Sequence, residues 1–270
     1  MNQDYIKPDA WSIIEEGYNA SRVKSSESLF SLGNGAMGQR ANFEEDYTGP
    51  TFQGSYIGGV YYPDKTRVGW WKNGYPEYFA KVINAPNWIG IGIVIDGETL
   101  DLNRCREIRD FRREFNMKEG WYQRSFEAVL QNGKHIVVES TRFLSMDLDE
   151  LGAIRYRITV PGEAASIEAE PYLDSGISNE DSNWDDQFWE TTRVHAEGSR
   201  AFIEAHTLKT LFHTCTFMDS RLTLGDEEVD AAPEVQKDKT YIGHKYQVAV
   251  PAGETLTIYK YGGYTVDLNH

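Results

Sequence analysis

The sequence predicts an all-β fold built as one large antiparallel sandwich. Several segments alternate apolar and polar side chains with a period of two, glycine-containing turn signals separate them, and no strand–helix alternation is visible. The length of 270 residues fits this class, because a β-sandwich commonly reaches about 200–250 residues as one unit. We therefore expect a single domain over residues 1–270 in which two sheets pack face to face.

Two kinds of strand are expected. Residues 154–160 and 255–258 alternate in the manner of half-buried strands, whereas residues 88–95 and 211–218 are continuous and rich in β-formers. Hairpin turns are expected at four dipeptides that end in glycine, namely Asp96-Gly97, Asn132-Gly133, Glu197-Gly198 and Ala252-Gly253.

One segment is ambiguous. Residues 110–119 contain good helix formers, but Phe111 and Phe115 could equally line one face of a strand, so this is the single place where a helix is considered.

Composition narrows the classes of partner and compartment. The 42 acidic and 27 basic residues leave a formal charge of −15, which repels nucleic acid and anionic membranes. No window approaches the ~18 apolar residues of a membrane span, and the first residues lack a secretion signal. We therefore expect a cytoplasmic protein with Cys105 and Cys215 as free thiols. The last residues, just beyond a predicted strand, are expected to mark a domain boundary.

Two short motifs imitate ligand sites. Residues 33–38 fit G-x-G-x-x-G, but no βαβ unit surrounds them, so a glycine-rich crossing is favoured over a nucleotide cofactor. Residues 181–185 resemble the opening of a calcium loop, yet Asp186 stands where glycine is needed and Thr192 where glutamate is needed. A solvated loop, or a polar loop near a sugar site, is the better interpretation.

Catalytic patterns are missing from the sequence. The histidines show no metal-ligand spacing, and no nucleophile elbow or phosphate-binding loop is present. The adjacent carboxylates of Glu44, Glu45 and Asp46 are expected to face water. We predict no catalytic residue, no metal and no cofactor in this chain.

Residues 33–86 are expected to form a long loop excursion from the sandwich. Aromatic rings among short polar side chains suit a sugar ring, whose C–H faces stack on aromatics while its hydroxyls bind polar groups. An alternative is that some of these rings cover a hydrophobic rim. The candidate sugar-binding residues are Trp70, Trp71, Lys72, Asn73, Tyr75, Tyr78 and Asn34.

The same stretch carries a family resemblance. The segments ESLFSLGNG at 27–35, GQR at 38–40, GSY at 54–56, VGWWKNGYP at 68–76 and NAPNW at 84–88 are specific. Weaker likeness continues through residues 151–154 and 179–185 to the end of the chain. On these motifs the chain resembles the amino-terminal domain of glycoside hydrolase family 65, which contains maltose, kojibiose and trehalose phosphorylases.

The resemblance implies a β-supersandwich of the galactose-mutarotase-like type that precedes a catalytic (α/α)6 barrel. In such enzymes a glutamic acid of the barrel protonates the glycosidic oxygen while inorganic phosphate, the co-substrate, attacks the anomeric carbon with inversion. Neither the glutamate nor the phosphate site can be matched in this chain. The resemblance implies a supporting role for residues 70–78 and 31–38 beside the barrel, a homodimeric parent and an α-glucoside disaccharide substrate, with maltose first.

Two other functions stay open at this point. A free-standing carbohydrate-binding module would need the aromatic loop and no catalytic group. An aldose epimerase would need a His and Glu pair for ring opening, and the sequence supplies histidines without an evident pairing. In the leading interpretation the isolated chain is inactive.

Overall fold

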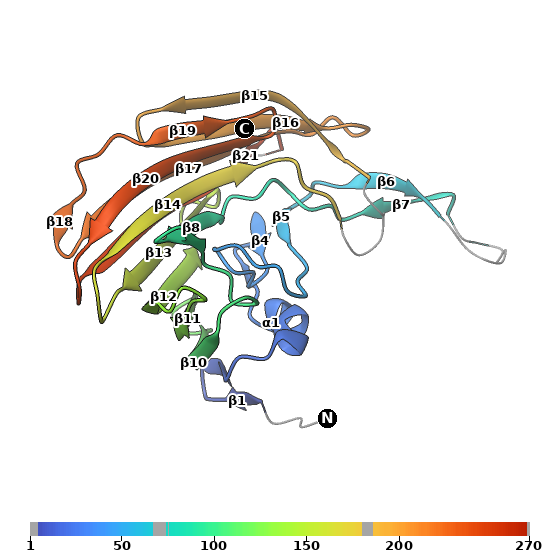
Figure 1. Ribbon diagram of the computed structural model, residues 1–270. Helices are drawn as coiled ribbons and strands as arrows, with labels where there is room; N and C mark the ends of the chain where they lie inside the picture. The colour runs from blue at the N-terminus through green and yellow to red at the C-terminus, as the bar shows by residue number, and fades with distance from the viewer. Residues whose placement is uncertain (1–4, 67–73, 75, 180–185, 269–270) are drawn as a thin grey trace.

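The computed structural model describes residues 5–66, 74, 76–179 and 186–268. Figure 1 shows long curved strands in stacked layers, with a short helix below one end and a two-stranded hairpin that projects from the sandwich. The expected all-β, antiparallel class is confirmed.

The larger sheet contains eleven strands. Their bounds are β1 (Ile6–Pro8), β2 (Ser12–Glu16), β10 (Glu107–Asn116), β11 (Trp121–Val129), β12 (His135–Leu144), β13 (Leu151–Thr159), β21 (Thr255–Val266), β17 (His213–Leu224), β16 (Arg200–Thr207) and β15 (Trp189–Glu197), in this spatial order, with β18 (Glu227–Glu228) paired to β17. One edge strand, β1, contains Pro8, and the other, β15, has a bulge between Thr191 and Arg193.

The smaller sheet has five strands, β19 (Glu234–Lys237), β20 (Tyr241–Val250), β14 (Ala165–Asp174), β8 (Ile91–Ile95) and β9 (Glu98–Thr99), again in spatial order. Strand β14 contacts β16 and β17 of the larger sheet, and β20 contacts β15 and β16. The two sheets therefore lie face to face over this half of the molecule, as Figure 1 shows.

The expected strands and turns are confirmed. Residues 154–160 and 255–258 fall in β13 and β21, while β8 and β17 begin a few residues inside the expected segments. Gly97, Gly133, Gly198 and Gly253 all have positive φ, and Asp96 has φ 49°, which gives the β8–β9 hairpin the left-handed turn that its strands need. The ambiguous segment 110–119 is largely strand, within β10.

Helix appears where it was not expected. A short α1 (Val23–Leu29) follows a 3₁₀ turn, η1 (Ala20–Arg22), and the Asn19 side chain caps this turn by accepting from the Ser21 amide at 3.0 Å. The expected excursion also contains small strands: β3 (Leu32–Gly33), β4 (Met37–Gln39) and β5 (Ser55–Ile57) form one sheet, and β6 (Tyr62–Lys65) pairs with β7 (Tyr78–Lys81).

The interior between the two sheets is mainly apolar, although Thr216, His244 and Lys260 are also buried there. Ile93 and Ile167 from the smaller sheet and Ile158 and Ile258 from the larger sheet are fully buried. Trp88 is also fully buried.

Trp88 lies over a pair of glycines, Gly152 and Gly262, which face each other across β13 and β21. A Cβ at Gly152 would come within 2.4 Å of the Trp88 ring, so the close approach requires glycine there.

The other half of the larger sheet has a polar interior. Glu15, Arg113, Arg124, Ser140 and Tyr156 stand side by side across β2, β10, β11, β12 and β13, and all five are buried. This row is covered by the loop that follows β4.

The carboxylates of that loop are inside the protein, so the expectation that Glu44 and Glu45 face water is wrong; Asp46 is exposed as expected. Arg124 binds Glu44 at 2.8 Å and both oxygens of Glu45 at 2.6 Å. Arg142 lies 3.6 Å from Glu44. The arginines on the sheet provide the positive charge that makes burial of two adjacent glutamates possible.

Candidate functional site

Most of the predicted sugar-binding residues lie outside the described residues: Trp70, Trp71, Lys72, Asn73 and Tyr75. Tyr78 is described, on β7, and about half of its surface (51%) is exposed. Its neighbour Phe79 is 47% exposed. The β6–β7 hairpin that carries them projects from the sandwich in Figure 1.

The base of this hairpin is fastened to the turn between β16 and β17. The Thr210 hydroxyl donates to the Tyr61 carbonyl at 2.9 Å, and the rings of Tyr61 and Phe212 meet edge to face at 5.5 Å. Lys209 lies over the Tyr62 ring at 4.6 Å. The hairpin is thus held to the sandwich by packing at its base as well as by its own strand pairing.

Exposed apolar side chains gather on the hairpin and on this turn. We call the set the hairpin surface: Tyr61, Tyr78, Phe79, Val82, Leu208 and Leu211, each at least 42% exposed. The end of the described chain lies nearby, because Leu268 lies against Gly59 and the Asp267 amide donates to the His213 carbonyl at 3.1 Å. An apolar surface of this kind is typical of an interaction site.

A small polar cavity of about 220 Å³ lies between the hairpin and the small sheet that contains β5. Its lining residues are Arg40, Phe52, Gln53, Tyr56, Val82, Asn84 and Asn179. Most of them belong to the motifs that carried the family resemblance, which are far apart in the sequence and meet here.

Side-chain amides hold the walls of this cavity together. Asn84 donates to the carbonyls of Gln53 and Ser178 at 2.9 and 3.0 Å, and Asn179 accepts from the Asn84 amide at 2.8 Å while donating to the Val82 carbonyl at 3.0 Å. Because these groups bind backbone, the motif residues fix the loop geometry here.

The side chain of Asn34 also holds backbone segments together, near the loop between β12 and β13. Its side-chain nitrogen donates to the carbonyls of Ser145 and Asp149 at 2.7 and 2.9 Å, and its oxygen accepts from the amides of Ala36 and Met37. The structure therefore uses Asn34 to tie a tight turn to the β12–β13 loop. A sugar contact by Asn34 stays a prediction.

Residues 13–269 match the family model described as glycosyl hydrolase family 65, N-terminal domain. The chain belongs to this family. The match spans nearly the whole sequence and includes the hairpin and the polar cavity.

Several relatives of this family 65 domain are named as phosphorylases. The chain is 42% identical over 252 residues to maltose phosphorylase from Bacillus subtilis (strain 168), covering 93% of this chain and 33% of the relative. It is 28% identical over 271 residues to alpha,alpha-trehalose phosphorylase from Thermoanaerobacter brockii, with 94% and 34% covered. A solved structure assigned as a kojibiose phosphorylase from the human microbiome superposes with a TM-score of 0.84 at 27% identity.

The family 65 domain spans about a third of these longer proteins, namely 33% of the maltose phosphorylase and 33% of the solved chain. The match to the solved chain covers 98% of the family 65 domain. Such coverage is consistent with a domain of a larger polypeptide.

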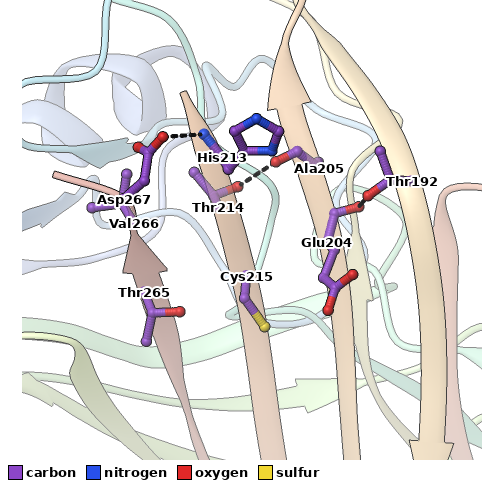
Figure 2. Close-up of a pocket in the computed structure, with 9 residues that line it drawn as sticks. All are labelled: Thr192, Glu204, Ala205, His213, Thr214, Cys215, Thr265, Val266 and Asp267. Atoms are coloured by element: carbon purple, nitrogen blue, oxygen red, sulfur yellow. Dashed lines mark hydrogen bonds between the residues drawn. The ribbon is translucent and has the colours of Figure 1, made fainter. Parts of the chain in front are cut away.

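A groove of about 250 Å³ lies on the solvent-facing side of β15, β16, β17 and β21. Figure 2 shows the side chains that line it. Glu204, Cys215 and Thr265 are neighbours across three of these strands. Burial raises the pKa of Cys215 to about 11, so at neutral pH the family 65 domain presents a protonated thiol here, which is a weak nucleophile.

Two His–Glu pairs are present among the described residues, and the sequence could not show either of them. His135 lies 3.1 Å from Glu127, and His206 lies 3.3 Å from Glu190. Glu190 stands directly across from His206, whereas Glu127 lies diagonally across from His135, which is opposite Val129; both glutamates are substantially exposed. An open sheet surface does not supply the enclosure that ring-opening chemistry needs.

Among residues 5–66, 74, 76–179 and 186–268, no group of three or more histidine, cysteine or acidic side chains could hold a metal ion. Within the same residues, no helix has the length and apolar character to cross a bilayer.

Proposed function

We propose that this chain is the non-catalytic amino-terminal domain of an inverting α-glucoside phosphorylase, with maltose and inorganic phosphate as substrates and glucose and β-glucose 1-phosphate as products. The observation that carries the proposal is the 42% identity to a maltose phosphorylase, against 28–29% to the trehalose and kojibiose phosphorylases of Thermoanaerobacter brockii. Phosphate replaces the base-activated water of an inverting hydrolase, so a single acidic residue suffices for the reaction. We place that acid in the catalytic barrel, outside this chain.

The role of the chain in this proposal is to support the barrel, which follows it in the parent polypeptide. The hairpin surface lies beside the end of β21, so a segment continuing from residue 268 would begin next to it. Covering Phe79, Val82 and Leu211, which are 47–64% exposed, would remove apolar area from water and stabilise the docked state. A homodimeric parent is a further part of this proposal.

Activity assays test the assignment of the chemistry. The 270-residue chain with maltose and phosphate should release no glucose 1-phosphate, whereas the complete parent polypeptide should release it. Robust turnover by the chain alone would refute the proposal.

A pair of substitutions tests the interface. Leu211→Asp is expected to lower the melting temperature of the complete polypeptide but leave that of the isolated chain unchanged, because Leu211 is 57% exposed in the latter. Val235→Asp, on β19 and 45% exposed, is the matched control and should change neither. Equal effects of both substitutions would contradict this docking surface.

The free-standing carbohydrate-binding module is the second candidate, and the exposed rings of Tyr78 and Phe79 favour it. Calorimetry with malto-oligosaccharides distinguishes the two functions. Binding that Trp71→Ala abolishes supports a module, and the scaffold interpretation expects no binding that depends on Trp71.

A further inference from the structure

We propose a second, independent site on this chain that binds a neutral sugar, at the end of the sandwich remote from the hairpin surface. Strand β17 runs to Leu224, but its neighbour β16 starts at Arg200, which pairs with Asp219. The edge of β17 beyond Asp219 therefore lacks β16. The segment after β18 crosses this gap, with the Val229 amide donating to the Leu222 carbonyl at 2.9 Å. The result is a cavity of about 660 Å³.

This volume suits a small carbohydrate, since ligand pockets measure about 300–1,000 Å³. The side chains that matter for binding are Asp219, Arg221, Glu228, Tyr246 and Tyr261, all of which line the cavity.

The Asp219 carboxylate of the wall is already held in place, and Arg221 lies beside an acidic partner. The Asp219 carboxylate accepts from the Ser199 hydroxyl at 2.6 Å and from Arg200 at 3.2 Å, which leaves acceptor capacity on both oxygens. The Arg221 guanidinium lies 3.8 Å from Glu228 and 5.7 Å from the Tyr259 ring. Groups fixed by neighbours lose little conformational entropy when a ligand binds.

Tyr261 supplies an aromatic face. It stands directly across from Asp219 on β21, and 45% of its surface is exposed although it lines the cavity. A ring beside a carboxylate and a guanidinium is the arrangement that stacks on the C–H face of a pyranose while the charged groups bind its hydroxyls.

The charges of the wall select for a neutral ligand. The net charge of the lining is negative, because it contains three carboxylates and one guanidinium: Asp219, Glu228, Asp230 and Arg221. A phosphate or nucleotide would therefore be repelled. A metal is also disfavoured, because no metal-binding group of acidic side chains is found in the described residues. An apolar ligand would remove the charged groups of the wall from water without offering them new hydrogen bonds.

The site is independent of the proposed docking surface. The hairpin surface adjoins the His213 end of β17, and the cavity adjoins Arg221, about 26 Å further along the strand at ~3.3 Å per residue. Figure 1 shows β18 and the β6–β7 hairpin at opposite ends of the sandwich. A ligand could therefore occupy this cavity while the barrel is docked.

Calorimetric or NMR titration of the 270-residue chain with glucose, maltose and maltotriose tests the proposal. We expect saturable binding with a Kd of about 1 mM, and at least a tenfold loss on Tyr261→Ala or Asp219→Asn. Tyr261→Phe keeps the ring and should bind as the unaltered chain does. The matched control is Phe143→Ala, which removes a ring of the same exposure (46%) that does not line the cavity.

Three outcomes would overturn the proposal: no saturable sugar binding, binding that survives both Tyr261→Ala and Asp219→Asn in folded protein, or tighter binding of inorganic phosphate than of sugar. Sugar binding lost on Trp71→Ala but kept in Tyr261→Ala would assign the binding to the Trp71 segment and overturn the cavity proposal. None of these results bears on whether the chain releases glucose 1-phosphate, so the two proposals fail separately.

Discussion

The two halves of the larger sheet bury opposite kinds of side chain. Where the smaller sheet covers β16 and β17, the interior is mainly apolar, as at Ile203 and Leu222, with a few uncharged polar side chains such as Thr216 among them. Where the loop after β4 covers β10–β12, the interior is a charged cluster, with Arg113, Arg124 and Arg142 on the sheet. Apolar packing is non-directional, whereas a buried ion pair accepts one partner in one geometry. We infer that the charged half specifies which loop covers it.

The largest effect is expected from breaking the charged half. Arg124→Leu leaves Glu44 and Glu45 buried beside fewer cations, and we expect the free energy of unfolding in urea to fall by about 3–5 kcal/mol.

Arg155→Leu is the control, because this arginine is 45% exposed and its pair with Glu139 at 3.3 Å contributes less than about 1 kcal/mol. Similar losses for the two variants would mean that the buried cluster contributes no more than a surface pair.

In the apolar half, adding side-chain volume should lower the stability of the protein. Gly152→Ala pushes a methyl group into Trp88, and we expect a loss of about 1–3 kcal/mol from overpacking. Gly162→Ala, which meets no atom within 4 Å, is the matched substitution and should change stability by less than about 0.5 kcal/mol. Thermal unfolding of both variants checks this, and an unchanged Gly152→Ala protein would show that Trp88 can move.

The buried Lys260, which lies between the two halves of the larger sheet, should make the free energy of unfolding depend on pH. This lysine is fully buried and donates to the carbonyls of Gly90 and Tyr172 at 2.7 and 2.6 Å; burial holds its pKa well below 10.5, although Glu44 opposes the shift. The unfolded chain then binds a proton that the folded chain does not. Stability should therefore rise with pH from the folded pKa up to about 10.4, the usual value for an unfolded lysine.

Lys260→Met should flatten this pH dependence of the unfolding free energy. Lys245→Met removes an ammonium that pairs with Glu168 at the surface, where the pairing raises the pKa, and should leave the upward slope in place. The same slope in Lys260→Met protein would assign it to another group.

The smallest effect concerns one hydrogen bond in the apolar half. Tyr264 is 3% exposed, and its hydroxyl donates to the Pro86 carbonyl at 2.6 Å. Tyr264→Phe should cost about 1 kcal/mol in denaturant unfolding, and Tyr261→Phe, at an exposed position, should cost nothing measurable. A neutral Tyr264→Phe would show that the carbonyl finds another partner.

The strands were readable from sequence because their side chains alternate, and the turns because glycine marks positive φ. The short α1 could not be predicted, because Val23–Leu29 has little apolar periodicity. This helix is stabilised by Glu27, whose carboxylate accepts at 2.8 Å from the amide of Phe52, a residue distant in the sequence. Such a long-range contact leaves no local signal.

The buried charges could have been predicted from the positions of the arginines within the strands, although the overall composition does not reveal them. Arg124 shares its strand face with Tyr122, Phe126 and Ala128, and Arg113 shares its face with Phe111. An arginine in the apolar phase of an alternating strand must find a carboxylate inside, and Glu44-Glu45 supplies it. The candidate sites depend instead on loops and strand ends brought together by topology, which one sequence does not reveal.

The edges of the larger sheet have a consequence for handling the isolated domain. Pro8 removes a backbone donor on one flank, and the irregular register at Thr191 and Arg193 twists the other. Neither flank offers a flat template on which another copy could extend the ladder. Concentrated preparations of the family 65 domain should therefore resist fibrillar stacking along these two edges.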